Sequence, residues 1–386
     1  MENYRPTKAI VDLQAIRDNI KNLRQYLPNS TSVIAVVKAD GYGHGVLEVA
    51  RTAIEAGSIM LAVATLEEAV HLRDCGITAD ILVMGPSPVV VAEKAAALGI
   101  HITVSDAEWL RQAVPKIGSG FSLKVHVKID TGMGRIGLRD EKSLNDIVDV
   151  IQGTSAFSLE GAFTHFACAD EEDPKKSEIQ FKRFMDLVAA FPERPRLVHA
   201  SNSAAALLYP EYALDAVRFG ISMYGIPPSR YVETKLPFQL KRAFTLQTEL
   251  AYVKLLEKGS GVGYGGTYET EQSEWIGTLP IGYADGLKRG LRNQEILIAG
   301  ERMPIVGSIC MDQCMVKLPR ELPVGEKVTL IGREGNEEIQ MEEWADRLGR
   351  FPTKSQLQLQ DVFREYIIPR MDKIILFRLS TNDHII

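Results

Sequence analysis

Between residues 30 and 221 the chain alternates short apolar runs with longer stretches in which apolar positions recur every three or four residues. Continuous apolar runs of this length are typical of strands buried on both faces of a parallel sheet. The stretches between them have the periodicity of amphipathic helices. Eight apolar runs occur, at 32–37, 58–64, 80–85, 101–104, 123–130, 159–166, 196–201 and 216–221.

Eight strand–helix units in about 200 residues predict a (β/α)8 barrel. A doubly wound open sheet is the alternative, but it usually has fewer strands, and its G-x-G-x-x-G signature does not occur here. Beyond residue 240 the pattern changes to alternation of apolar and polar positions with glycine-rich turns, which predicts a mainly antiparallel β domain. We therefore expect a barrel over residues 1–240 and a β domain over residues 241–386.

Composition narrows the functional class. The 386 residues include 45% hydrophobic and 24% charged residues, with a net charge of −6 and no basic block. A nucleic-acid partner is therefore not expected. No apolar stretch predicts a signal peptide or a membrane span. Four cysteines favour a reducing, cytoplasmic location over a disulfide framework, and Cys310 and Cys314 lack the second ligand pair that a zinc site needs.

Polar residues cluster where the predicted strands end, which is where barrels build their active sites. Each one alone has an ordinary interpretation as a surface lysine, a core histidine or a helix-capping serine. Together they describe one rim of the barrel. The residues are Lys38, Lys128, Asp130, Arg135, His165, His199, Ser201, Asn202, Ser203, Arg218, Gly220 and Ile221.

The chemistry of this rim is that of a cofactor pocket. Ser203 and Gly220–Ile221 follow strands 7 and 8, whose loops commonly bind phosphate in barrels. Lys38 ends the first strand, where a partly deprotonated amine can form an imine with an aldehyde. A phosphate site beside an imine-forming lysine predicts pyridoxal 5′-phosphate as the cofactor.

Eight motifs, in this order, resemble those of the alanine racemase family. The resemblance extends from about residue 8 to residue 349 and implies a barrel followed by a β domain, with pyridoxal phosphate as the cofactor and alanine as the substrate. The motifs are AVVKADGYGHG, VHVKIDTGMGRIG, FTHFACAD, VHASNSAA, AVRFGISMYG, GVGYGGTYE, IGTLPIGYADG and CMDQ.

The resemblance also implies roles in the barrel. Lys38 matches the lysine that binds the cofactor and acts as the base on D-alanine. Arg218 matches the arginine that faces the pyridine nitrogen. The positions matching the remaining cofactor contacts, most of them to the phosphate, are Tyr42, His199, Ser203, Gly220 and Ile221.

Tyr264 matches the second base, which acts on L-alanine and in the family reaches the barrel of the other subunit of a head-to-tail homodimer. A phenol ordinarily titrates near pH 10, and His165 matches the residue that assists the tyrosine. Arg135 matches a contact to the substrate carboxylate, and Lys128 matches a lysine that is often carbamylated. Tyr283 and Met311 match residues that narrow the entrance and contact the substrate.

This sequence departs from the family pattern in three places. Met84 stands near the expected cofactor ring where the family often has leucine, a tolerated exchange. Ser308 stands where many relatives have an arginine. After residue 349 the recognisable motifs stop, and one interpretation is a frameshift in the source gene, so residues 350–386 are expected to be atypical.

Other activities remain open on the sequence. The small substrate side chain leaves room for a broader-specificity racemase or a serine racemase. A decarboxylase of the same architecture would have no need of Tyr264 and His165. A non-catalytic carrier of pyridoxal phosphate is usually a barrel without a second domain.

Overall fold

The structure is a computed structural model, which describes residues 4–349 and the backbone of residues 375–378. The chain divides into two compact units. One unit comprises residues 15–242, and the other combines residues 1–14 with residues 243–386. The prediction about residues 350–386 falls outside the described residues, apart from the backbone of strand β20 (Ile375–Arg378).

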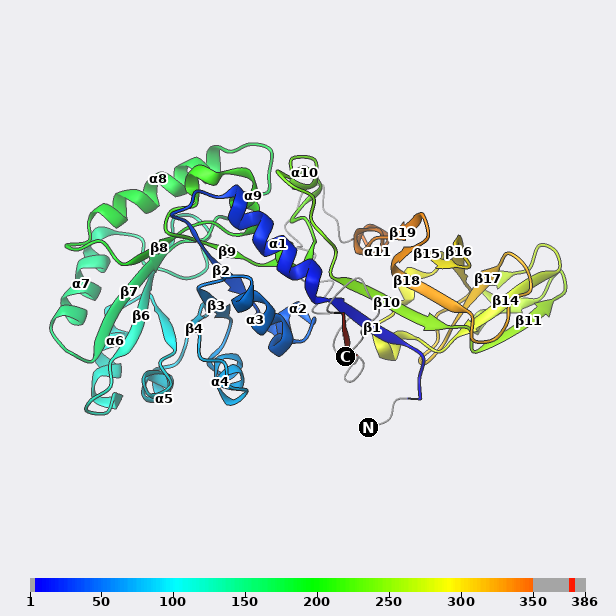
Figure 1. Cartoon of the computed structure of the whole chain (residues 1–386), viewed down its shortest axis with the longest axis horizontal. Coiled ribbons are helices and arrows are strands. Elements are labelled where there is room, and N and C mark those ends of the chain that lie inside the picture. The colour runs from blue at the N-terminus through cyan, green and yellow to red at the C-terminus, as the bar shows by residue number, and fades with distance from the viewer. Residues whose placement is uncertain (1–3, 350–374, 379–386) are drawn as a thin grey trace. The chain divides into compact units, whose positions relative to one another are not determined.

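In the part of the chain that the structure describes, residues 15–242 contain eight parallel strands in the order β8-β7-β6-β5-β4-β3-β2-β9 (Figure 1). Backbone hydrogen bonds from Arg218 to Ser201 (2.9 Å) and from Asp215 to Val198 (3.2 Å) join the two ends of this order. The barrel prediction is confirmed for all eight runs. The strands are β2 (Ser32–Val36), β3 (Met60–Val63), β4 (Asp80–Val83), β5 (His101–Val104), β6 (Leu123–Lys128), β7 (Phe157–Phe163), β8 (Leu197–His199) and β9 (Ala216–Phe219).

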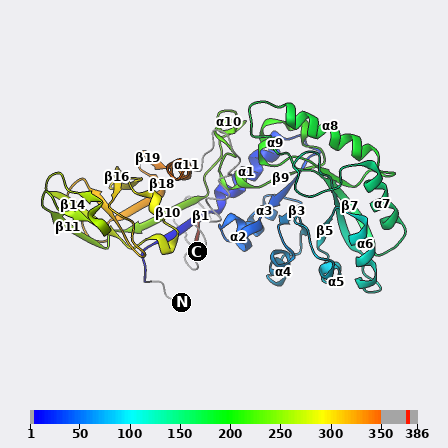
Figure 2. The same cartoon turned by 180° about the vertical axis from the view of Figure 1, so that it is seen from behind.

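Helices follow most of these strands and lie on their outer side, as α4 to α8 show in Figure 2. Each buries one apolar face; in α7, for example, Leu144, Ile147 and Ile151 point inward. The main helices are α1 (Leu13–Tyr26), α3 (Val46–Glu55), α4 (Leu66–Asp74), α5 (Ala92–Ala97), α6 (Ala107–Ala113), α7 (Glu141–Gln152), α8 (Lys175–Ala189), α9 (Ser203–Leu208) and α10 (Arg230–Glu233).

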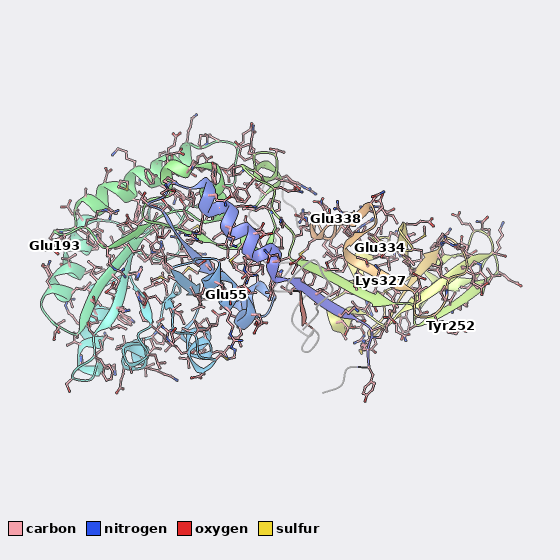
Figure 3. The ribbon with its side chains drawn as sticks, viewed as in Figure 1. Glu55, Glu193, Tyr252, Lys327, Glu334 and Glu338 are labelled. Atoms are coloured by element: carbon pink, nitrogen blue, oxygen red, sulfur yellow. The ribbon has the colours of Figure 1, made fainter. Side chains whose placement is uncertain are left out.

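The other unit is built on a mainly antiparallel sheet in the order β11-β14-β17-β16-β15-β18-β10-β1-β20, as the alternating pattern predicts. At the two ends of β18, Lys327 Nζ lies 3.6 Å from Glu334 Oε2, and both residues are labelled in Figure 3. The elements of this unit are β1 (Lys8–Asp12), β10 (Phe244–Glu249), β11 (Tyr252–Leu256), β12 (Gly261–Val262), β13 (Tyr268–Glu269), β14 (Glu274–Leu279), β15 (Glu295–Ile298), β16 (Glu301–Val306), β17 (Cys314–Leu318), β18 (Lys327–Glu334), β19 (Glu337–Ile339) and α11 (Met341–Arg347).

The beginning of the chain differs from the expected domain division, which placed residues 1–240 in the barrel. Strand β1 pairs antiparallel with β10, from Lys8 opposite Gln247 to Val11 opposite Phe244. Its alternating burial suits a sheet with one covered face, in contrast to most barrel strands, which are buried along most of their length. Residues 1–14 therefore belong to the β unit. Within the described residues, none of the helices has the length and apolarity to cross a bilayer.

Candidate active site

The segment after β2 carries Lys38 on an unusual turn. Lys38 starts the short element α2 (Lys38–Tyr42), in which Ala39, Asp40, Gly41 and Tyr42 all have φ between 53° and 61°. A left-handed conformation costs a non-glycine residue roughly 1–2 kcal/mol. Three of these four residues carry a Cβ atom, so the surrounding structure must hold the turn in place.

Glu68, at the start of α4, supplies part of that support. One carboxylate oxygen accepts from the Ala39 N–H at 2.7 Å, and the other accepts from the Ala64 N–H at 2.7 Å. The same side chain closes a capping box with Thr65. Glu68 thus joins the lysine segment to the adjacent helix, and the sequence analysis did not identify this residue.

Gly220, after β9, lies in a small polar cradle with Tyr42 and Ser203. Its N–H donates to Ser203 Oγ at 2.9 Å. A Cβ atom built on Gly220 would lie 2.8 Å from Tyr42 Oη and 3.7 Å from Ser203 Oγ. Only glycine therefore leaves this space open between two hydroxyl groups. The structure brings these three predicted residues together.

Arg218 in β9 is almost fully buried and donates in several directions. Nη1 donates to His199 Nδ1 at 2.8 Å, and Nη2 donates to the carbonyl oxygens of Thr164 and Ala200 at 2.7 Å each. Nη2 also lies 3.3 Å from His165 Nδ1. Burial, and then the charge of Arg135, lower the pKa of Arg218 to about 9, so the guanidinium remains charged at neutral pH.

Lys128 ends β6 and is buried beside these cations. Its Nζ donates to the Ile129 carbonyl oxygen at 2.9 Å. Burial, and then the charge of Arg218, lower the pKa of Lys128 to about 7. Asp130 opposes this shift, and Arg135 adds a smaller effect that favours it. A substantial fraction of this amine is therefore neutral near pH 7.

The loop from Asp130 to Arg135 is anchored by its first residue. Asp130 Oδ1 accepts from the N–H groups of Gly132 and Gly134 at 3.1 and 2.9 Å. Arg135 itself is exposed, yet its charge contributes to lowering the pKa of His165 well below the usual value, after burial and Arg218. His165 is accordingly neutral, with Arg218 and Lys128 close to it.

The predicted residues of the β unit lie on three adjoining loops. Ser308 Oγ donates to the Tyr264 carbonyl oxygen at 3.1 Å. The Tyr283 N–H donates to the Cys310 carbonyl oxygen at 2.9 Å, next to Met311. The side chains of Tyr264 and Met311 are 72% and 54% exposed. They project from this unit rather than packing within it.

Arg5 supports the Tyr283 loop, which sequence reasoning missed. Its two terminal nitrogens donate to the two carboxylate oxygens of Asp285 at 2.6 Å each, and Nε donates to the Pro280 carbonyl oxygen at 2.8 Å. Gly282 is needed beside it, because a Cβ atom there would collide with the Met311 carbonyl oxygen. No single motif signals a pairing between residues 280 positions apart.

These side chains fit pyridoxal phosphate. The cradle at Gly220 offers two hydroxyl groups to a phosphate. Arg218 offers a charged N–H donor suited to a ring nitrogen, and Lys38 lies 5.9 Å from the centre of the Tyr42 ring, beside that cradle. Each predicted barrel residue except the exposed Arg135 is at least half-buried, as expected of a pocket lining.

Comparisons with known proteins agree with this arrangement. A family model described as alanine racemase, N-terminal domain, matches residues 11–228, and one described as alanine racemase, C-terminal domain, matches residues 243–366. The chain is 50% identical over 345 residues to the alanine racemase of Geobacillus stearothermophilus, covering 89% of each protein. It is 45% identical to alanine racemase 1 of Bacillus subtilis, covering 89% of this chain and 88% of that one.

Solved structures show the same fold. The alanine racemase of Bacillus anthracis with bound L-Ala-P superimposes with a TM-score of 0.91 at 40% identity, covering 100% of this chain and 98% of that one. A histidine racemase from Leuconostoc mesenteroides superimposes with a TM-score of 0.89 at 30% identity, covering 97% of this chain and 99% of that one.

Proposed function

The chain belongs to the alanine racemase family, and on that premise we propose that it interconverts L-alanine and D-alanine with pyridoxal phosphate and two protein bases. The observation that carries the proposal is the gathering of Lys38, Tyr42, Ser203, Arg218 and Gly220 at one rim of the barrel. Pyridoxal phosphate supplies the electron sink that makes the substrate Cα–H acidic. The protein must then bind the substrate, take a proton from one face of Cα and return a proton to the opposite face.

Lys38 and Tyr264 are the two bases of the proposal. The amine of Lys38 takes the Cα proton of D-alanine, and the phenol oxygen of Tyr264 takes that of L-alanine from the opposite face. Because Arg218 Nη2 faces His165 Nδ1, neutral His165 carries its proton on Nε2, from which it can donate a hydrogen bond to the phenol oxygen of Tyr264 and stabilise the phenolate. Arg135 and Met311 contact the substrate carboxylate, with Tyr283 at the entrance.

We propose that Tyr264 serves the barrel of a second subunit. The side chains of Tyr264 and Met311 are both exposed, and they lie on adjoining loops of the β unit. Large apolar side chains that project from a surface together are typical of protein interfaces. A head-to-tail homodimer with two shared active sites would bury them.

Lys128 suits the carbamylation that the family resemblance implies. A carbamate forms when a neutral amine attacks carbon dioxide with loss of one proton, and the low pKa of Lys128 supplies the neutral amine. The resulting carboxylate would pair with Arg135 or Arg218 and offset their mutual repulsion. We propose that Lys128 is carbamylated and thereby orients Arg135.

The family also contains other substrate specificities, since one structural relative is a histidine racemase. Several curated alanine racemases are 45–50% identical to this chain and the histidine racemase is 30% identical, which favours alanine as the substrate. All four cysteines are free thiols, in keeping with a reducing compartment. We propose a cytoplasmic enzyme whose D-alanine is used for cell-wall peptidoglycan.

The test is D-alanine formation from L-alanine by the purified chain with excess pyridoxal phosphate, with L-serine and L-histidine as competing substrates. Tyr264→Phe is expected to lower racemisation by about a thousandfold, while exchange of the α-hydrogen of D-alanine with heavy water continues through Lys38. Tyr252→Phe, at an exposed tyrosine of the same unit that has no role in the proposed site (Figure 3), is the matched control and should keep full activity. Loss of exchange from both enantiomers in Tyr264→Phe would contradict the two-base assignment.

A further inference from the structure

A chain of three fully buried histidines leads away from Arg218 across the barrel strands. His199 lies in β8, His126 in β6 and His101 in β5. His199 Nε2 lies 3.3 Å from His126 Nδ1, and His126 Nε2 lies 3.0 Å from His101 Nδ1. The proposed function includes His199 as a cofactor contact, and it assigns no role to His126 or His101.

The two ends of the chain have opposite hydrogen-bonding character. At one end, Arg218 Nη1 lies 2.8 Å from His199 Nδ1, and a guanidinium can only donate. At the other end, His101 Nε2 lies 3.1 Å from Asp80 Oδ1, and a carboxylate can only accept. This last contact is electrostatic, because the Nε2 atom has no well-directed hydrogen bond among the described residues.

These ends dictate one tautomer for each ring. Because Arg218 donates to His199 Nδ1, the His199 proton sits on Nε2 and points at His126 Nδ1. The His126 proton then sits on Nε2 and points at His101 Nδ1. The His101 proton in turn sits on Nε2 and faces Asp80. Every ring is neutral, and all the hydrogen bonds run in one direction.

The charges around the chain favour this neutral, directed state. Burial is the main cause that lowers the pKa of all three histidines, and Arg218 and Arg196 add to it at His199 and His126 respectively. Asp80, together with the weaker influence of Glu160, opposes the shift at His101. The groups facing the far end are Asp80, Lys124, Glu160 and Arg196, and Lys124 Nζ donates to Asp80 Oδ1 at 3.0 Å.

The intervening strand β7 is shaped to let the chain pass. A Cβ atom on Gly161 would lie 2.5 Å from His126 Nδ1 and 2.6 Å from the Leu197 carbonyl oxygen. The pairing of β6 with β7 also shifts register between Val125 and His126, directly beside this point. A bulge and a side-chain-free position therefore coincide where His126 reaches His199.

We propose that Asp80, His101 and His126 are positioning residues that hold the Arg218 guanidinium, through His199, in the orientation that faces the cofactor ring nitrogen. The inference rests on the proposed function, in which Arg218 has that role. No proton is transferred along the chain. Its one-directional hydrogen bonds fix the acceptor at His199 Nδ1, and so fix the guanidinium plane.

The tautomers can be measured directly. In the holoenzyme labelled with nitrogen-15 at its seven histidines, two-bond proton–nitrogen spectra distinguish a protonated Nε2 from a protonated Nδ1. His199, His126 and His101 should all be neutral with the proton on Nε2 at pH 7, and single His→Gln variants assign the signals. A proton on Nδ1 of any of the three, or a charged His126 ring, would overturn the proposal. This result does not depend on racemase activity.

The positioning role has its own test. His126→Leu interrupts the chain, whereas His126→Gln can accept from His199 and donate to His101. We expect His126→Leu to lower kcat about tenfold with little change in KM and to shift the nitrogen-15 signal of the labelled cofactor. We expect His126→Gln to restore most of the kcat and most of the original cofactor signal. Asp80→Asn, at the half-exposed end of the chain, should shift the same signal without the folding risk of a core substitution. Lys124→Met is the matched control and should have a smaller effect.

Two failures are distinguishable. If the wild-type holoenzyme does not racemise alanine, the proposed function is wrong. The tautomers of His199, His126 and His101 then still test whether the hydrogen bonds between the histidines run in one direction. If the wild type is active but His126→Leu and Asp80→Asn keep its kcat and cofactor signal, the positioning role is wrong.

Discussion

Single residues of the site differ from their ordinary chemistry because of their neighbours, and Lys128 is the clearest case. An exposed lysine is protonated throughout the neutral range. Burial, and then the charge of Arg218, lower the pKa of Lys128 to about 7, and Arg135 adds a smaller effect in the same direction. The sequence placed this residue at the end of a barrel strand, but its carbamylation was expected only through the resemblance to relatives. The pKa shift that makes a carbamate possible depends on burial and on Arg218, which lies 90 positions further along the chain.

The lowered pKa of Lys128 predicts a pH-dependent modification. Below pH 7 the amine is protonated and does not react with carbon dioxide, and above pH 7 it is mostly neutral. With carbon-13 bicarbonate, the enzyme should show a carbamate signal that is strong at pH 8 and weak at pH 6. Lys128→Arg should lack the signal. A signal of equal strength at both values of pH would contradict the assignment.

Ser308 has a positioning role that the family comparison does not supply. Its hydroxyl donates to the Tyr264 carbonyl oxygen, and its oxygen lies 3.1 Å from Thr267 Oγ1, so it ties together both ends of the tyrosine loop. We expect Ser308→Ala to lower kcat/KM about fivefold, the equivalent of about one lost hydrogen bond. The fall must be equal in both directions, because the enantiomers have equal free energies. Ser273→Ala, at an exposed serine, is the control. An unchanged kcat/KM in Ser308→Ala would show that the tyrosine loop keeps its conformation without the Ser308 hydroxyl.

Among the elements, the left-handed turn at Lys38 depends most on a distant partner. Its glycines were visible in the sequence, but the positive φ values of Ala39, Asp40 and Tyr42 were not, because non-glycine residues rarely adopt them. Two supports make the turn possible. Glu68 accepts from the Ala39 N–H, and Asp40 Oδ1 accepts from the Val46 N–H at 2.8 Å.

Removing Glu68 should therefore destabilise the chain as well as the site. Glu68→Ala loses charge-assisted bonds to three backbone N–H groups, those of Ala39, Ala64 and Thr65, and we expect a loss of about 3 kcal/mol in the free energy of unfolding. Denaturant unfolding with Glu93→Ala, an exposed glutamate, as control measures it. A loss below about 1 kcal/mol would mean that the turn is held by its other contacts. Cofactor binding should weaken in parallel.

The periodicity of the sequence predicted the strands better than the special positions within them. Eight continuous apolar runs gave eight barrel strands because burial on both faces demands such runs. The bulge of β7 at Gly161 was not predictable, since a glycine in an apolar run does not reveal which ring lies over it. His126 likewise lies in the run at 123–130, where its position predicts only a buried side chain.

At the scale of the whole molecule, the first residues of the chain belong to the β unit and not to the barrel, where the sequence pattern placed them. Strand β1 completes the sheet of the β unit through β10, so the chain begins in one unit, builds the barrel and returns. Short strands at chain ends are hard to assign because pairing partners far along the chain leave no local signal. The residues of the proposed site are divided between the two units, with Lys38 within 15–242 and Tyr264 within 243–349.

The central claim is that an active site needs Lys38 from one subunit and Tyr264 from another. The most direct measurement mixes the two inactive variants Lys38→Ala and Tyr264→Phe under conditions that exchange subunits, and follows racemisation of alanine. In a shared-site dimer, each hybrid has one intact site and one doubly altered site. Random exchange should therefore restore about a quarter of the wild-type activity. Hybrids that form, as native mass spectrometry would show, but remain inactive would contradict the shared site.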